Sequence, residues 1–128
     1  MKKKPSILPE KALNENIAQR REIAACEHFA GNEKFIRRSL ELQRETNLKF
    51  DLTCDCEDGA QLGDEIQHAK MISKVIKNNG IEKQRVGVRV PEIKNKNWKK
   101  IANHLIGECG DKLSYITIPK VDSYKEAA

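Results

Sequence analysis

Short apolar segments of strand length alternate with amphipathic segments of helix length, and this alternation is the feature that most limits the fold of the chain. The strand-like segments are 50–57, 85–90 and 113–118, and the helix-like segments are 33–46, 65–79 and 98–109. Single strands that alternate with single helices predict βα units with parallel strands and right-handed connections. The sequence therefore predicts an α/β fold built on a parallel sheet.

Residues that begin and end helices stand at matching positions. Asn32, Asp64 and Asn97 can each cap the helix that follows, and Gly80 and Gly110 can end two of these helices. Between these signals, largely apolar residues repeat with helical spacing, line one face of each helix and are predicted to face the core. They are Phe35, Ile36, Ser39 and Leu40, then Ile66, Ala69, Ile72, Val75 and Ile76, then Trp98, Ile101, Ala102, Leu105 and Cys109.

The length of 128 residues suits one domain and excludes a complete eight-stranded α/β barrel, which needs about 250 residues. Any barrel motif must therefore belong to an incomplete barrel. Residues 1–19 are predicted to be an N-terminal extension with a short helix that starts at Pro9, and residues 20–128 to be the folded domain.

Charge and composition limit the partners and the compartment. The chain carries 24 Lys and Arg against 19 Asp and Glu, and the excess is concentrated at its start and in 94–100. Aromatic residues are only 5%, which argues against specific nucleic-acid binding. The sequence has no apolar run of about 18 residues and no signal region, so no membrane contact and a cytoplasmic location are expected.

The four cysteines are expected to be reduced thiols that fill apolar positions; they are Cys26, Cys54, Cys56 and Cys109. Cys54 and Cys56 lack the spacing of a zinc site, since a single residue separates them and no second pair follows. His68 and His104 lie on predicted helices and are expected to be solvated or structural. His28 is interpreted as a loop histidine, with proton transfer as the alternative.

Acidic residues gather at the end of the predicted strand 50–57. Strict alternation places Phe50, Leu52, Cys54 and Cys56 on one face and Asp51, Thr53, Asp55 and Glu57 on the other, and Asp58 follows directly. Parallel sheets are usually covered on both faces, and ligand sites lie at the carboxyl ends of their strands. Glu57 and Asp58 therefore mark a substrate or metal site, or else a structural ion-pair network.

The next two strands bring cations to the same end of the predicted sheet. Arg89 lies near the end of 85–90, on the face opposite Val86, Val88 and Val90. It can pair with Glu57 or hold a substrate carboxylate through two hydrogen bonds. Lys120 follows the last strand, where a lysine can also simply be solvated.

Three strand-end motifs resemble those of the HpcH/HpaI aldolase and citrate lyase β-subunit family. They are Asp55-Cys56-Glu57-Asp58-Gly59-Ala60, Val88-Arg89-Val90 and Ile118-Pro119-Lys120-Val121, in the order found in that family. Phe29-Ala30-Gly31-Asn32 resembles the first loop and helix of the family, which makes 21–26 the expected first strand. The resemblance implies that 20–128 corresponds to the N-terminal half of a TIM-barrel, (β/α)8, lyase domain with about its first four strands.

The resemblance also implies an activity and roles for residues. The family uses a divalent cation, usually Mg²⁺ with Mn²⁺ as the alternative, to stabilise an enolate while a carbon–carbon bond of a 2-oxo acid, a 3-hydroxy acid or an acyl-CoA thioester is cleaved or formed. Arg89 matches the substrate-binding arginine. Glu57 and Asp58 match the catalytic acidic pair that acts through metal-bound water, and Asp55 matches an acidic residue with a structural or a site role.

Departures from the family pattern limit the expected activity. The first strand lacks the usual proline, Gly59 stands in place of alanine, and the direct metal ligands of the family come from later strands, so none is assigned here. We therefore expect a fragment of a lyase that is inactive alone and self-associates into a homo-oligomer through its uncovered strand edges. The alternative is a non-catalytic module that binds an acidic ligand, such as a coenzyme A phosphate, around 94–100.

Overall fold

The computed structural model describes residues 24–60, 62–79 and 84–128. Four short strands alternate with helices along this part of the chain. The elements are β1 (Glu27–Ala30), α2 (Glu33–Glu45), β2 (Asp51–Asp55), α3 (Glu65–Asn78), β3 (Val86–Arg89), α4 (Trp98–Cys109), η2 (Gly110–Lys112), β4 (Tyr115–Thr117) and α5 (Tyr124–Ala127). The predicted extension 1–19 and its helix lie outside the described residues, so the predicted boundary stays a prediction.

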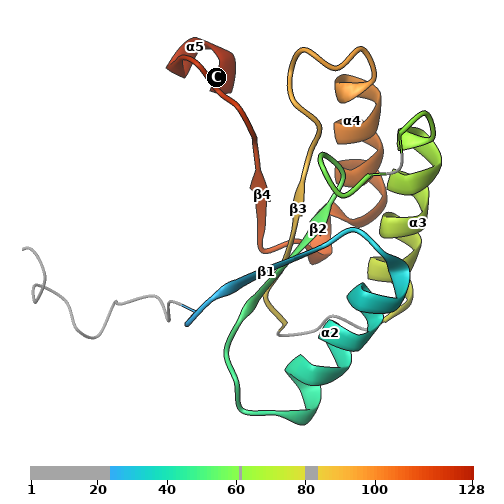
Figure 1. The fold of residues 1–128 in the computed structure, drawn as a ribbon, viewed down its shortest axis with the longest axis vertical. Coiled ribbons are helices and arrows are strands. Elements are labelled where there is room, and N and C mark those ends of the chain that lie inside the picture. Colours follow the sequence, from blue (N-terminus) through green and yellow to red (C-terminus); the bar gives the residue numbers. More distant parts are fainter. Residues whose placement is uncertain (1–23, 61, 80–83) are drawn as a thin grey trace, which may run out of the picture.

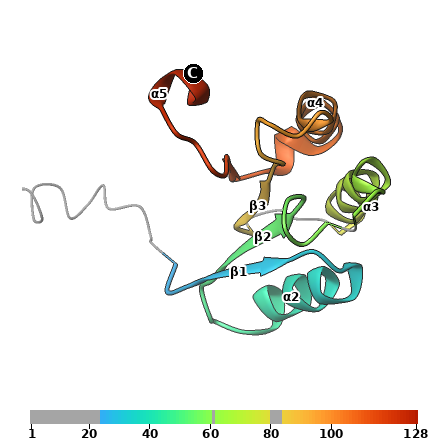
Figure 2. The ribbon, with the colours of Figure 1, turned by 45° about the horizontal axis from the view of Figure 1, so that its top comes forward.

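The four strands form one sheet in the order β1-β2-β3-β4, and every neighbouring pair is parallel. Figures 1 and 2 show α2, α3 and α4 side by side on one face of this sheet, with α5 apart from them beyond the end of β4. Consecutive strands that are neighbours, with a helix between each pair, are the repeat of a (β/α) barrel. The predicted α/β fold with barrel-type βα units is confirmed.

The core lies between the sheet and the three helices. Alternate residues of β2 and β3 point toward the helices because successive side chains of a strand face opposite sides. The fully buried side chains of this layer include Ile36 and Leu40 of α2, Leu52 and Cys54 of β2, Ile72 and Ile76 of α3, Val86 and Val88 of β3, and Ile101 and Leu105 of α4. The predicted apolar stripes of the three helices form most of this core.

The first strand differs from the sequence-based expectation. Regular pairing starts at Glu27, opposite Asp51, rather than in 21–26, of which residues 24–26 are described and are not in a strand. Ala25 and Cys26 already bond to the backbone of Lys49 and Asp51, but their side chains are exposed. Three of the four residues of β1 are exposed as well, so an apolar run does not mark this strand.

The three helices begin at the predicted residues, but only one of the three predicted caps makes a capping hydrogen bond from its side chain. Asn32 caps α2 by accepting a hydrogen bond from the backbone N–H of Lys34 at 2.9 Å. Asp64 and Asn97 occupy the cap positions of α3 and α4 without a capping hydrogen bond from their side chains. Phe35 is 61% exposed, contrary to the prediction, because Ile36, one residue on, takes the inward position.

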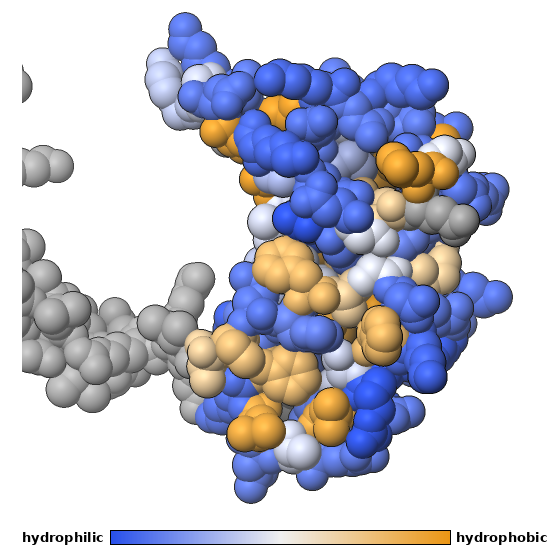
Figure 3. Space-filling view, viewed as in Figure 1, coloured by the Kyte–Doolittle hydropathy of each residue, from blue (hydrophilic) through white to orange (hydrophobic). Residues whose placement is uncertain are grey.

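Apolar side chains also reach the surface, where Figure 3 shows them as separate patches among hydrophilic ones. Ile116 and Ile118, in and after β4, are 40% and 44% exposed. Cys54, Cys56 and Cys109 are buried as predicted, whereas Cys26 is exposed, and all four are free thiols. None of the helices in the described part of the chain is long and apolar enough to cross a membrane.

Candidate functional site

The site forms where β2 and β3 end on the face of the sheet opposite the helices. Asp55 and Arg89 are partners in the strand register, so their side chains project from neighbouring strands at the same level. Arg89 donates from Nε to Oδ1 of Asp55 at 2.9 Å and from Nη2 to Oδ2 at 2.7 Å. This two-pronged geometry fixes the plane of the guanidinium group and therefore where its other N–H groups point.

The carboxylate of Asp55 also organises the loop that follows β2. Its Oδ1 accepts the backbone N–H of Glu57 and its Oδ2 accepts that of Gly59, each at 2.9 Å. Burial alone would raise the pKa of Asp55, but the hydrogen bonds from Arg89 and from the two backbone N–H groups outweigh it and hold the pKa below its ordinary value. Asp55 is therefore a structural anchor for both Arg89 and the acidic loop.

Glu57 and Asp58 converge on the same arginine and on Lys120. Nη1 of Arg89 lies 3.4 Å from Oε2 of Glu57, and its Nη2 lies 3.6 Å from Oδ2 of Asp58. Lys120 forms an ion pair with Oε1 of Glu57, and its Nζ lies 3.7 Å from Oδ1 of Asp58. The Glu57 side chain is 7% exposed and that of Asp58 is 68% exposed, so Asp58 is the acidic residue of this pair that is open to solvent.

Lys120 reaches Glu57 from an unusual backbone conformation. Its φ is +52°, in the left-handed region that residues other than glycine rarely adopt. The preceding Pro119 is buried, and the hydrogen bond to Glu57 raises the pKa of Lys120. Residues held in this region cluster at functional sites, which favours a site role over a merely solvated lysine.

A second polar row lies one level deeper on the same face. Thr53 is fully buried; its hydroxyl oxygen lies 2.8 Å from the Tyr115 hydroxyl, and its hydroxyl donates a hydrogen bond to Glu27. The Tyr115 ring lies against Gly87, the residue between Thr53 and Tyr115 in the register. Burial raises the pKa of Tyr115 to about 12. The row forms the floor beneath Asp55 and Arg89.

Two further contacts shape the rim. The Phe29 ring stacks on the guanidinium of Arg89, with 4.9 Å between the Arg89 Cζ and the ring centroid. A pocket of about 150 Å³ opens beside the acidic loop and includes Glu57, Asp58, Pro91 and Lys120 in its lining. The loops after β1 and β2 touch at Gly31, where a side chain would collide with the carbonyl of Gly59.

The residues predicted for the site are thus brought together, although their chemical roles stay predictions. The sequence-based interpretation underestimated Lys120 and missed the row of Glu27, Thr53 and Tyr115. The signal for this row is Gly87, which lies on the polar face of β3 and is level with Tyr115 of the next strand.

The three histidines do not contribute side chains to the site. His28 lies in β1 level with Leu52, on the face opposite Arg89. His68 bonds to the backbone oxygen of Asp55 at 2.8 Å, and His104 contacts Ser73. The bond from His68 to the Asp55 backbone is a structural contact that supports the site, in agreement with the expectation for His68.

The described residues do not build a complete metal site. Nowhere in 24–60, 62–79 and 84–128 do three or more His, Cys, Asp or Glu side chains gather as ligands. Glu57 offers carboxylate oxygens that suit Mg²⁺, but Lys120 and Arg89 already occupy them. A magnesium centre would need further ligands besides Glu57 and Asp58.

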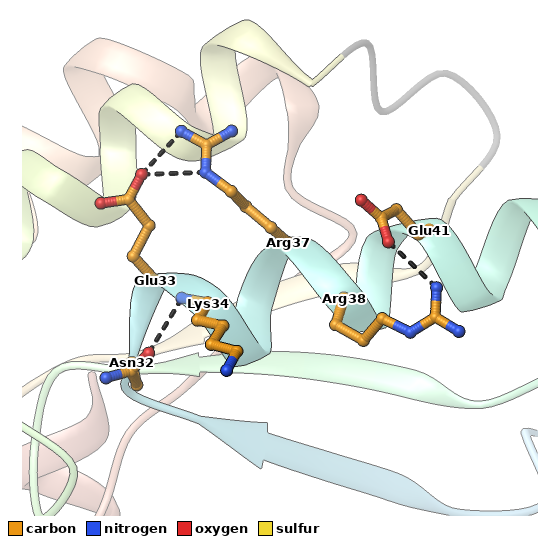
Figure 4. A pocket seen from close by; sticks show the side chains of 6 residues that line it. All are labelled: Asn32, Glu33, Lys34, Arg37, Arg38 and Glu41. Atoms are coloured by element: carbon orange, nitrogen blue, oxygen red, sulfur yellow. Dashed lines mark hydrogen bonds and ion pairs between the residues drawn. The ribbon is translucent and has the colours of Figure 1, made fainter.

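A larger pocket of about 670 Å³ on α2 does not carry a comparable site. Figure 4 shows its charged side chains paired with one another along the helix, Glu33 with Arg37 and Arg38 with Glu41. All four are exposed. Such pairs at helical spacing are the usual solvated face of a helix. In the basic stretch 94–100, Lys94 likewise pairs with exposed Asp122, at 3.5 Å.

The fold and the position of the site define a protein of the parallel, TIM-barrel-like α/β class with its polar residues at the carboxyl ends of the strands. The structure is similar to the crystal structure of a citrate lyase from Burkholderia xenovorans LB400, with a TM-score of 0.72 and 37% sequence identity. The match covers 83% of this chain and 33% of that one, so the chain spans about a third of the length of that citrate lyase.

This match confirms the resemblance found in the strand-end motifs: the chain is related to the citrate lyase family. A scan against protein-family models gives no match. A search of curated proteins gives none either.

Proposed function

We propose that the site at the ends of β2 and β3 is part of the active site of a carbon–carbon lyase or aldolase that acts on a 2-oxo acid, a 3-hydroxy acid or an acyl-CoA thioester. The observation that carries this proposal is Arg89, fixed by Asp55 beside Glu57, Asp58 and Lys120. The relation to the citrate lyase family supports the reaction class. Because the chain spans a third of that relative, the activity of a whole protein is itself part of the proposal.

Arg89 is proposed to bind the substrate carboxylate. Its bonds to Asp55 use Nε and one N–H of Nη2, and the remaining N–H groups face Glu57 and Asp58 at 3.4 and 3.6 Å. These longer ion pairs are weaker than the bonds to Asp55. A substrate carboxylate can therefore displace the exposed Asp58 and accept a paired hydrogen bond from the outer edge of the guanidinium.

The same residues suit the charge that develops during the reaction. When the carbon–carbon bond breaks, its electron pair passes to an enolate oxygen. The N–H groups of Arg89 and the ammonium group of Lys120 provide donors already oriented toward this side of the site. Glu57, together with Asp58 once the substrate carboxylate has displaced it from Arg89, is proposed to hold the reacting water or hydroxyl group and to exchange a proton with it.

The predicted cofactor and assembly stay predictions. Mg²⁺, or Mn²⁺ in its place, would need ligands in addition to Glu57 and Asp58, and the roles given to Arg89 and Lys120 do not depend on it. A homo-oligomer is tested by light scattering coupled to size-exclusion chromatography, which reads the mass in solution directly.

The decisive experiment measures binding of a 2-oxo dicarboxylate, oxaloacetate, to the chain by NMR titration. Arg89→Gln is expected to weaken binding by about two orders of magnitude, the loss of a charge-assisted bidentate contact of about 3 kcal/mol. Arg85→Gln is the matched control, because Arg85 also pairs with an aspartate, Asp51, but at the other end of β3. Equal losses in the two variants would overturn the proposal.

A further inference from the structure

A second polar pocket lies between α3 and α4, on residues that the strand-end site does not use. Its volume is about 340 Å³, and Lys70, Ser73, Lys74, Lys77, His104 and Glu108 contribute to its lining. Small-molecule sites begin at about 300 Å³, so the pocket suits a small anion with a short attached group.

The wall of this pocket is a hydrogen-bonded pair, in which Ser73 is buried and His104 is half-buried. Ser73 is 4% exposed and donates its hydroxyl proton to the backbone oxygen of Lys70 at 3.0 Å. Its Oγ also lies 3.0 Å from Nε2 of His104. Because a hydroxyl has one proton, Nε2 of His104 must be the donor in this second bond. The pair holds the imidazole ring against the pocket from α4.

Two of the three lysines at the pocket lack a carboxylate partner among the described residues. Lys70, Lys74 and Lys77 are spaced so that they share one face of α3, and like charges at this spacing repel one another. Lys77 is paired with Glu108, with 2.8 Å between Nζ and Oε2. Among the described residues, Lys70 and Lys74 have no carboxylate partner. Two adjacent positive charges therefore border a concave polar surface.

We propose that this pocket binds a phosphate group, free or as a monoester, between the ammonium groups of Lys70 and Lys74 and the wall formed by Ser73 and His104. A phosphate dianion matches two lysine charges, and lysine is a common phosphate ligand in proteins. The inference concerns α3 and α4 alone and does not depend on the lyase proposal.

The test titrates the 128-residue chain with inorganic phosphate at constant ionic strength and follows backbone amide and His104 ring signals by NMR. Lys70→Gln combined with Lys74→Gln is expected to weaken binding roughly tenfold, about 1.4 kcal/mol. Lys34→Gln combined with Lys125→Gln removes the same charge from exposed positions outside the pocket and is expected to change affinity less than about twofold. Ribose 5-phosphate in a parallel titration distinguishes a monoester site, if it binds more tightly, from a free-phosphate site.

A variant that is expected to tighten phosphate binding, rather than weaken it, provides a further test. Glu108→Gln removes the carboxylate that holds Lys77 and is expected to tighten phosphate binding by about twofold to threefold. Circular dichroism checks that each variant is folded. Signal changes that avoid the residues around Ser73 and His104, or equal weakening in the two double variants, would overturn the proposal, because the attraction would then come from net charge alone.

Discussion

The phenol ring of Tyr115 lies where the side chain of any residue other than glycine would stand at position 87. This contact lets Tyr115 cross β3 and place its hydroxyl 2.8 Å from that of Thr53 on β2. The floor of the site therefore depends on two residues: Gly87 leaves space on β3, and the long side chain of Tyr115 on β4 fills it.

Gly87→Ala is expected to destabilise the protein by about 1–3 kcal/mol, because the new methyl group collides with the Tyr115 ring. Urea unfolding followed by circular dichroism measures the change. Gly107→Ala in α4 is the control, since its methyl group meets nothing within 4 Å, and it is expected to stabilise by about 0.5–1 kcal/mol. A Gly87→Ala variant as stable as wild type would contradict the contact.

Tyr115 should ionise at a higher pH than an ordinary tyrosine. Burial raises the pKa of Tyr115 to about 12. The raised pKa stabilises the fold fully below pH about 10, the ordinary tyrosine value, and this contribution is lost as pH rises through about 12. Ultraviolet titration should show a phenolate step near pH 12, and Tyr115→Phe should remove it.

Arg89→Met is expected to destabilise by about 3 kcal/mol, because it leaves the buried carboxylate of Asp55 without its cation. Arg85→Met is the matched change, one residue before the start of the same strand. Since the Arg85 side chain is 46% exposed, its loss should destabilise by at most about 1 kcal/mol. Similar unfolding midpoints for the two variants would show that Asp55 does not depend on Arg89.

The same pair predicts an acid dependence of stability. Because the pKa of Asp55 is lowered in the folded protein, its contribution is fully present above the unfolded value of about 3.9 and is lost as pH falls through the folded value. The free energy of unfolding of wild type and Asp55→Asn should therefore converge below pH about 4. A difference that stays constant down to pH 2.5 would contradict this linkage.

Thiol chemistry should separate one cysteine from the other three. Burial raises the pKa of Cys54 to about 12 and that of Cys109 to about 11, and it also raises the pKa of Cys56. At pH 8 an aromatic disulfide reagent should react quickly with the exposed Cys26 alone. Cys26→Ser should abolish the fast phase. A second fast thiol would mean that the helices open readily over β2.

The fold and part of the site could be predicted because they follow from local patterns. Alternation along β2 and the helical stripes fix which residues are buried, and strand ends fix where Arg89, Glu57 and Asp58 lie. The position of β1 was not predicted correctly, because its residues are mostly exposed and no hydrophobic pattern marks it. Lys120 and the row of Thr53 and Tyr115 depend on backbone conformation and on the register between strands, which a single segment does not encode.

The convergence of Asp55, Glu57, Asp58, Arg89 and Lys120 has a consequence for charge balance. Three carboxylates meet two cations, so the group carries one negative charge in excess. A ligand that enters with its own carboxylate increases this excess unless it brings a positive ion or a proton, or moves Asp58 out into solvent. We therefore expect that a carboxylate ligand binds at this end of the sheet only when a cation or proton enters with it or when the Asp58 carboxylate leaves the group.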